Sequence, residues 1–339
     1  MAYELSVGLR AVAGWRGVTG PGLGDKVGTM TIRRPRPLQR GDWVGLFCPA
    51  GAPLEAGRID AGRKVLEARG YRVKEGPNAR SRHGGFAGTD AQRLSDLNGL
   101  LADPEVRMLM AVRGGYGCGR LLDGIDVAAV HRDPKWVVGY SDVTALQMSL
   151  LARTGLVSVS GPMAGVELAR GMDGFTEASL WSLLEGETRG LPLGNPEGEP
   201  WEVVVPGVAE GRLMGGCLSL VASLMGSGHL PSMDGALLVL EDIHESLHRL
   251  DRMLVHLRLA GVLGRVSAVV LGQFTHCGPA DPRGGWLEWG QIVREVLGGL
   301  GVPVVMRHAY GHEARKRSLP WGLRARLDAR EGGGLTLME

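Results

Sequence analysis

The chain has 339 residues, of which 44% are hydrophobic and 22% charged, and its formal net charge is +2. This length exceeds what one hydrophobic core usually serves, so two domains are expected. The composition is typical of a globular enzyme, and the small net charge argues against an acidic tail or a surface for nucleic acid. The 55 glycines and 18 prolines are scattered along the chain, which indicates many turns rather than disorder.

The four cysteines, Cys48, Cys118, Cys217 and Cys277, lie far apart and form no C-x-x-C pair. Their spacing does not support a disulfide framework or a cysteine zinc site, and it favours the reducing cytoplasm. The first residues lack the basic and apolar regions and the cleavage site of a secretory signal. No run of about 18 apolar residues is present that could span a membrane. We therefore expect a cytoplasmic protein without a membrane segment.

Residues 1–35 are glycine-rich and poorly patterned, and we expect an extension outside the fold, with Met30 as an alternative start. From residue 42, short apolar runs alternate with helical patterns. Repeated units of this kind predict a parallel sheet flanked by helices, a Rossmann-like first domain over residues 36–165. The expected strands are DWVGLFCPAG, YRVKEG, VRMLMAVRGGYG and KWVVGYS, and the expected helices are LEAGRIDAGRKVLEARG, AQRLSDLNGLLAD and DVTALQMSLLARTG.

Residues 166–205 are interpreted as a linker with one helix, near FTEASLWSLLEG. After Pro206 the pattern resumes, with strands expected at GALLVLED and VSAVVLGQF and a terminal hairpin at RARLDAR and GLTLME. Between them, SLHRLDRMLVHLRLAGVL has apolar residues near helical spacing. The second domain, residues 206–339, is predicted to be a smaller α/β or β-rich domain, so the fold class is α/β with two domains.

The letters HESLH at residues 244–248 match the H-E-x-x-H signature of zinc peptidases. That signature requires both imidazoles on one helical face, where they converge on a tetrahedral ion. Here an apolar run that fits a buried strand ends just before Glu241, and the helix is expected to begin near Ser246. His244 would then lie outside the helix. We interpret His244 and His248 as polar residues at a strand-to-helix turn, without a metal.

The segment VVGYSDVTAL places Ser141 between a strand and a helix. Unpaired N–H groups and the positive end of the helix dipole stabilise the negative charge that develops when a serine attacks a carbonyl. The N–H of Asp142 is the natural first donor. The arrangement follows the logic of a nucleophile elbow without its G-x-S-x-G letters. The alternative is that Ser141 or Asp142 is an ordinary helix cap.

The preceding strand ends in RGGYGCGR, whose four glycines, Gly114, Gly115, Gly117 and Gly119, permit a tight loop. The loop lacks the G-x-G-x-x-G and G-K-[ST] patterns, so nucleotide binding has little support. Parallel sheets bind ligands at the carboxyl ends of their strands, where this loop is expected. A glycine N–H that faces Ser141 would complete an oxyanion hole.

Five motifs carry a family resemblance: RGGYGCGRLLDGID, GYSDVTAL, LLVLEDIHE with RLDRMLVHLRLAGVL, VVLGQF, and YGHEARKRSLPWG. In this order, over roughly residues 40–335, they resemble the LD-carboxypeptidases, the muramoyltetrapeptide carboxypeptidase type of serine peptidase. The resemblance implies a Ser, Glu, His catalytic set, which falls on Ser141, Glu241 and His312. Such a set is chemically coherent, because a serine needs a base and the base needs an acid that fixes its tautomer.

The resemblance implies an enzyme that releases the terminal D-alanine of murein tetrapeptides during cell-wall recycling, as a homodimer and without metal or cofactor. Ser141 would attack the carbonyl, His312 would transfer the proton, and Glu241 would orient His312. The other expected site residues are Asp142 and Gly115 in the oxyanion hole, and Gly114 and Tyr140 at the substrate.

Two features depart from the family pattern. Cys217 ends a GGC element where the family usually has asparagine, and the loop after His312 is basic. We interpret that loop as a solvated surface, with binding of substrate carboxylates as the alternative; its charged residues are Glu313, Arg315, Lys316 and Arg317.

Three other functions stay open at this point. One is a hydrolase of peptidyl-nucleotide antibiotics that uses the same triad. The others are a zinc peptidase built on HESLH and a non-catalytic two-domain binding protein.

Overall fold

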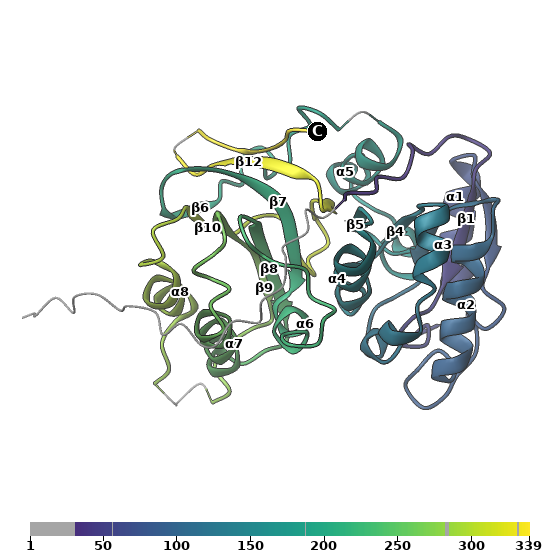
Figure 1. Cartoon of the computed structure of the whole chain (residues 1–339), viewed down its shortest axis with the longest axis horizontal. Coiled ribbons are helices and arrows are strands. Elements are labelled where there is room, and N and C mark those ends of the chain that lie inside the picture. Colours follow the sequence, from purple (N-terminus) through teal and green to yellow (C-terminus); the bar gives the residue numbers. More distant parts are fainter. Residues whose placement is uncertain (1–30, 56, 187, 282–284, 331) are drawn as a thin grey trace, which may run out of the picture. The chain divides into compact units, whose positions relative to one another are not determined.

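The computed structural model describes residues 31–55, 57–186, 188–281, 285–330 and 332–339. Of the extension expected over residues 1–35, residues 1–30 lie outside the described residues. From residue 31 onward the chain forms two β-sheets with helices packed against them, which confirms the predicted α/β class (Figure 1). Within the described ranges, no helix is both long and apolar enough to cross a membrane.

In the described part of the chain the first sheet has six strands, in the order β11-β5-β4-β3-β1-β2. The five strands from the N-terminal half run parallel, as the alternation of strands and helices predicts. They are β1 (Trp43–Phe47), β2 (Arg72–Glu75), β3 (Val106–Ala111), β4 (Trp136–Val138) and β5 (Ser158–Ser160). The helices between them are α1 (Gly57–Ala68), α2 (Asp90–Ala102), α3 (Val127–Arg132) and α4 (Val143–Thr154).

Helix α4 is buried on nearly all sides, since ten of its twelve residues are buried. It packs against β5 and β11 (Leu319–Trp321) of the first sheet (Figure 1). On its other side it packs against β7 (Val208–Cys217) and α6 (Leu218–Ser223) of the second sheet. Its sequence therefore carries little amphipathic pattern, as is expected of a helix enclosed by protein. The helix ends at Gly155, whose φ of 71° closes it in the left-handed conformation.

The second sheet has seven strands among the described residues, in the order β13-β12-β7-β8-β9-β10-β6. Its centre, β7 to β10, is parallel, and β6 and β12 pair antiparallel at its flanks. The strands are β6 (Glu202–Val205), β7 (Val208–Cys217), β8 (Leu237–Ile243), β9 (Ala268–Thr275), β10 (Val304–Met306), β12 (Arg324–Asp328) and β13 (Leu335–Leu337). Its helices are α6 (Leu218–Ser223), α7 (Leu247–Leu259) and α8 (Trp289–Leu297).

The segment predicted as a linker contains helix α5 (Gly174–Glu185), where FTEASLWSLLEG predicts it. A π-helical turn, η3 (Ala164–Leu168), lies at the start of this segment. Glu185 at the end of α5 accepts hydrogen bonds from Arg69 at 2.6 and 2.7 Å and from the Tyr71 hydroxyl at 2.5 Å. Helix α5 is thus attached to the α1–β2 connection of the first sheet.

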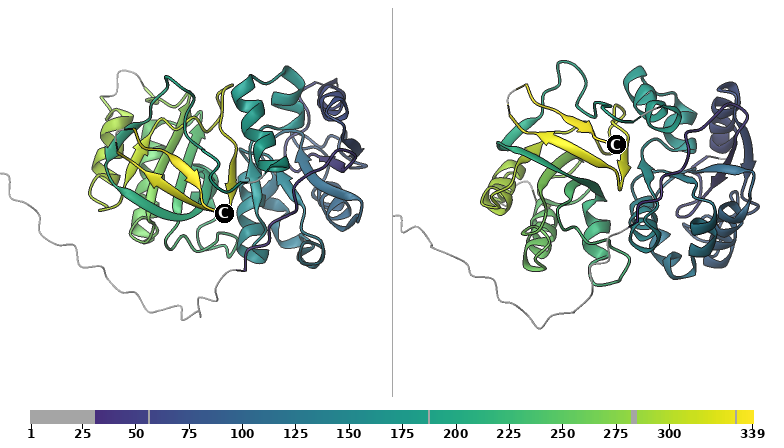
Figure 2. Two further views of the ribbon diagram at one scale, coloured as in Figure 1. Left: turned by 90° about the horizontal axis from the view of Figure 1, so that it is seen from above. Right: turned by 45° about the horizontal axis from the view of Figure 1, so that its top comes forward.

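Strand β11 (Leu319–Trp321) comes from the C-terminal part of the chain but pairs antiparallel with β5 of the first sheet. In Figure 2 the yellow C-terminal segment lies between the green strands and the teal elements. The sequence does not predict this strand, because it has three residues and contains Pro320, which cannot donate to a sheet.

One buried side-chain amide connects β11 with backbone carbonyls near the ends of β4 and β5. The Gln147 side chain, on α4, donates to the carbonyls of Gly139 at 3.0 Å and Val159 at 2.8 Å. Its oxygen accepts a hydrogen bond from the Trp321 indole at 3.2 Å. Gln147 and Trp321 are both fully buried, so water cannot replace these bonds.

The substitution Gln147→Met should therefore reduce the free energy of unfolding by about 1 to 3 kcal/mol, because it leaves the buried indole N–H without an acceptor. Urea titration measures this loss. The exposed Gln39→Met serves as the control and should leave the unfolding midpoint unchanged. Equal midpoints for the two variants would contradict a structural role for Gln147.

Candidate active site

Ser141 lies at a sharp turn between β4 and α4. Its φ is 62°, a left-handed conformation that is uncommon and strained for a residue with a side chain. Gly139, two residues earlier, has a φ of 157°, and helix α4 begins at Val143. A strained serine between a strand and a helix is the backbone arrangement of a nucleophile elbow.

Asp142 is not an ordinary cap of α4, because its side chain makes no capping hydrogen bond. Its buried carboxylate instead accepts a hydrogen bond from the N–H of Cys118 at 2.7 Å. Burial raises the pKa of Asp142, and the bond from Cys118 opposes this rise. Asp142 thus fastens the glycine loop to the residue that follows Ser141.

Gly114 is the loop glycine that faces Ser141. A Cβ atom at position 114 would lie 2.9 Å from the Ser141 Cβ, 3.1 Å from its Oγ and 3.4 Å from the N of Asp142. A Cβ at Gly115 would instead lie 3.2 Å from the backbone of Gly51. Gly51 also donates its N–H to the carbonyl of Gly114 at 3.1 Å, which holds the loop in place.

Glu241 of β8 and His312 of the loop after β10 form a hydrogen-bonded pair. Glu241 lies near the carboxyl end of β8 and is fully buried, and its Oε2 is 2.7 Å from Nδ1 of His312. With its proton on Nδ1, His312 donates to the carboxylate and keeps Nε2 available as a base. Burial raises the pKa of Glu241, and the hydrogen bond from His312 opposes this rise. Gly311 permits the approach, because a Cβ there would lie 3.2 Å from Oε2.

Tyr140 connects this pair to the serine. Its ring lies edge-on to the His312 imidazole, with 5.0 Å between the ring centroids. Since Tyr140 directly precedes Ser141, the structure brings the His312 loop next to the nucleophile turn. The predicted site residues from both sheets therefore lie around one point of the fold.

The interpretation of the loop after His312 as a solvated surface is wrong for Lys316. Its side chain is only 2% exposed, and its ammonium nitrogen is 2.6 Å from Glu167. Arg317 is half-buried, donates to the carbonyl of Gly194 and lies over the Phe175 ring. The loop folds back because buried partners lie far away in sequence, which its run of charges does not reveal. Glu313 and Arg315 are exposed, as predicted.

Cys217 lies at the end of β7, beside Glu241 in register. Its N–H donates to the Thr144 hydroxyl of α4 at 3.2 Å, and its thiol donates to Asp242 at 3.3 Å. Burial raises its pKa well above the ordinary value, so the thiol stays protonated. A Cβ at Gly216 would lie 2.5 Å from the Thr144 hydroxyl. The GGC element therefore lets β7 approach the helix that carries Ser141.

The HESLH segment does not place its histidines on one helix. Helix α7 begins at Leu247 after the N-cap Ser246, as predicted. His244 lies before it with a φ of 58° and stacks on His276 at 5.2 Å, whereas His248 packs against Trp286 at 5.3 Å. Nowhere in the described ranges do three or more His, Cys, Asp or Glu side chains form a group suited to a metal ion.

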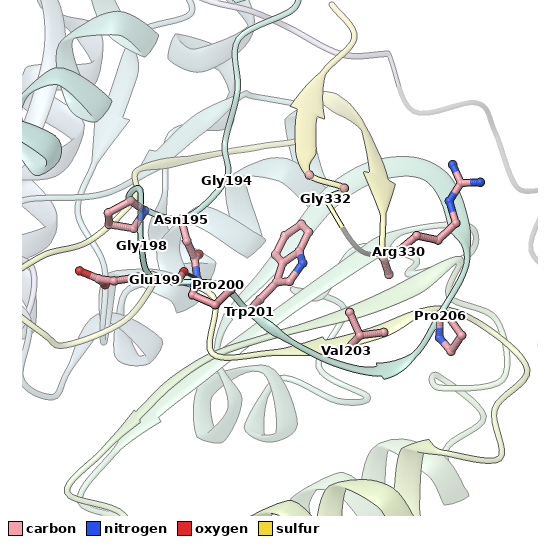
Figure 3. A pocket seen from close by; sticks show the side chains of 14 residues that line it. Gly194, Asn195, Gly198, Glu199, Pro200, Trp201, Val203, Pro206, Arg330 and Gly332 are labelled. Carbon is pink, nitrogen blue, oxygen red and sulfur yellow. Dashed lines mark hydrogen bonds between the residues drawn. The ribbon is translucent and has the colours of Figure 1, made fainter.

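A hollow of about 780 Å³ lies between residues 194–206 and the residues that join β12 to β13 (Figure 3). Asn195 lines it, and the amide oxygen of Asn195 accepts hydrogen bonds from Nδ1 of His308 and the N–H of Ala309, both at 2.8 Å. His308 is fully buried, and burial lowers its pKa to about 3, so it is neutral. Asn195 thus anchors the chain segment that leads to His312.

Comparison with known proteins identifies the family. Residues 44–161 match the LD-carboxypeptidase N-terminal domain, and residues 210–327 match the LD-carboxypeptidase C-terminal domain. The murein tetrapeptide carboxypeptidase of Pseudomonas aeruginosa is 33% identical over 84% of this chain and 92% of its own. The chain belongs to the LD-carboxypeptidase family and is a peptidase.

Solved structures show the same fold. Muramoyltetrapeptide carboxypeptidase from Oxalobacter formigenes matches with a TM-score of 0.77 at 31% identity, over 88% of this chain and 99% of that one. The microcin C7 self-immunity protein MccF matches with a TM-score of 0.82 at 26% identity, over 90% and 98%. The MccF sequence from Escherichia coli is 27% identical over 86% of this chain and 92% of its own. Another MccF structure contains aspartyl sulfamoyl adenosine.

Gly114→Ala should reduce peptidase activity by roughly 10- to 100-fold, because the added methyl group displaces the Ser141 side chain from its working position. The melting temperature and the rate of peptide hydrolysis are measured together. Gly119→Ala in the same loop is the matched control, since a Cβ there meets nothing within 4 Å. Equal activity in the two variants would show that the approach of Gly114 to Ser141 has no catalytic consequence.

Proposed function

We propose that this protein is a serine carboxypeptidase that releases the terminal D-alanine of murein tetrapeptides in cell-wall recycling. The observation that carries the proposal is the buried Glu241–His312 hydrogen bond, which lies next to the strained turn of Ser141. Such a pair supplies what a serine nucleophile requires, a base held in one tautomer by a carboxylate. The relatives that are murein tetrapeptide carboxypeptidases support the choice of substrate.

In this proposal the Ser141 hydroxyl attacks the carbonyl carbon that precedes the terminal D-alanine, and its proton passes to Nε2 of His312. Glu241 stabilises the imidazolium that forms. His312 then protonates the leaving amine, which departs as D-alanine, and a water molecule hydrolyses the acyl-enzyme by the reverse proton transfers.

The oxyanion is held by backbone donors. Among the described residues, the N–H groups of Asp142 and Gly115 donate to no backbone acceptor, which supports their proposed role. Asp142 is the N-cap residue of α4, where the helix dipole also favours negative charge, and Gly115 follows Gly114, which faces Ser141. Gly114 and Tyr140, which border Ser141, are proposed to contact the substrate.

We further propose that the enzyme acts in the cytoplasm as a homodimer. The cytoplasmic setting is supported by the four cysteines, which are all free thiols. The dimer rests on the family resemblance.

A second candidate function is the hydrolysis of a peptidyl-nucleotide antibiotic by the same three residues. It is supported by the likeness to the microcin C7 self-immunity protein, one structure of which holds an aminoacyl sulfamoyl nucleoside. The two candidates share their chemistry, so a comparison of kcat/KM for tetrapeptide and aspartyl sulfamoyl adenosine separates them.

Purified enzyme incubated with sugar-free murein tetrapeptide should release D-alanine, and Ser141→Ala should reduce kcat by at least about 10⁴-fold, since the nucleophile acts with its base as a unit. Release is measured by coupled oxidation of D-alanine. The exposed Ser223→Ala is the matched control and should keep the wild-type rate.

The same assay tests the zinc alternative. His248→Ala and treatment with a chelator should leave the rate unchanged, because the two HESLH histidines have separate partners. Release that persists in Ser141→Ala, or that disappears with the chelator, would end the serine mechanism.

A further inference from the structure

We propose that Lys316 is a positioning residue of the catalytic centre, which holds His312 in place through Tyr140 and Glu167 and acts on Glu241 through its charge. The inference rests on the proposed serine mechanism. It concerns a buried cation that touches neither of the two acid–base residues and that the proposed mechanism does not use.

Lys316 is held in a fully enclosed site. Its ammonium nitrogen lies 2.6 Å from Oε1 of Glu167 and 4.0 Å from the centroid of the Tyr140 ring. Its side chain is 2% exposed and that of Glu167 10%. Burial of a charged pair has a large cost in lost hydration, so such a pair is weak evidence for a role in stability alone. A buried pair of this kind is better explained by the residue that it holds in place, Tyr140.

The pair fixes Tyr140 at several points. The Tyr140 hydroxyl donates to Oε1 of Glu167 at 2.7 Å, the same oxygen that accepts from Lys316. The ammonium lies over the ring face, a cation–π contact that gains strength when it is shielded from water. The His312 imidazole packs against the same ring. Tyr140 therefore cannot shift without moving His312 or breaking the bonds to the pair.

The ion pair also joins segments that are distant in sequence. Lys316 follows His312 by four residues, and its N–H donates to the Thr176 hydroxyl of α5 at 3.0 Å. The second oxygen of Glu167 accepts from the N–H of Met163 at 3.0 Å. Glu167 belongs to the π-helical turn η3, a rare element that often marks functional sites. The loop that carries the base is thus fastened to the end of the sheet that carries Ser141.

The charge of Lys316 also acts on Glu241. Burial raises the pKa of Glu241, while His312 and, more weakly, Lys316 lower it and Asp242 raises it further. Lys316 therefore favours the ionised carboxylate that His312 requires. Burial raises the pKa values of three further groups near Glu241 well above their ordinary ranges, so these groups are neutral: Cys217, Tyr140 and Tyr310.

Lys316→Met tests the inference. It should lower kcat for D-alanine release by roughly 10- to 100-fold with little change in KM, because the imidazole is less well placed while the substrate contacts stay. The acid limb of kcat/KM should move to higher pH, since loss of the cation raises the pKa of Glu241 and the carboxylate is protonated sooner as the pH falls. The exposed Lys64→Met should change neither quantity.

The double variant Glu167→Gln/Lys316→Met separates positioning from stability. It removes both charges, and the Tyr140 hydroxyl can still donate to the amide oxygen of the new side chain. We expect the double variant to recover the melting temperature that Lys316→Met loses, but to keep the low kcat and the shifted acid limb. Recovery of kcat in step with the melting temperature would show that Lys316 has only a structural role.

A substrate-free measurement distinguishes this inference from the proposed function. The Nδ1 proton of His312 in its bond to Glu241 should give a low-field proton NMR resonance, assigned by its absence in His312→Ala. In Lys316→Met this resonance should shift. As the pH is lowered, it should also disappear at a higher pH than in the wild type. An unchanged resonance would overturn the role of Lys316, whatever the substrate. A changed resonance without D-alanine release would support Lys316 and contradict the proposed substrate.

Discussion

The hydrogen bond between Glu241 and His312 is the interaction on which the site depends. A carboxylate that is completely shielded from water is costly unless a donor satisfies it, and the described donor is an imidazole from a loop 71 residues later. Glu241 lies on β8, so the position of the pair depends on the second sheet. The packing of this sheet against α4 then delivers the pair to Ser141, so that the geometry of the site follows from the contact between the two sheets.

Close backbone approaches at glycines occur both in the contact between the sheets and inside the site. Gly216 lies against Thr144 across the contact between the sheets, where an added Cβ would be 2.5 Å from the hydroxyl. Gly114 lies against Ser141 and Gly311 against Glu241, where an added Cβ would be 2.9 and 3.2 Å from the neighbour. The high glycine content of the chain is therefore partly a property of the site. Position 141 is the opposite case, because a residue with a side chain, Ser141, adopts a left-handed conformation that usually favours glycine. Such strain persists only where surrounding contacts hold it, and the bond from Cys118 to Asp142 is one of them.

Much of the architecture could be predicted from the sequence, because buried parallel strands and the helices between them have strong local patterns. The start of α7 after Ser246, which separates His244 from His248, follows from the apolar run of β8. The positions of Ser141, Glu241 and His312 came from motif order and not from periodicity, since no local pattern shows that distant residues converge. Strand β11 and the burial of Lys316 were missed for the same reason. Each is decided by a partner more than a hundred residues away, namely β5 and Glu167.

Strand β11 makes the two halves of this protein interdependent. A fragment that ended before the second sheet would leave the edge of β5 unpaired and the Gln147 amide without its indole donor, and exposed strand edges promote association between chains. The polypeptide must therefore be synthesised past Trp321 before the first sheet can gain its last strand. A chain that stopped before His312 would lack both this residue and strand β11 of the sheet next to Ser141, so the proposed catalytic residues come together only when both sheets are formed.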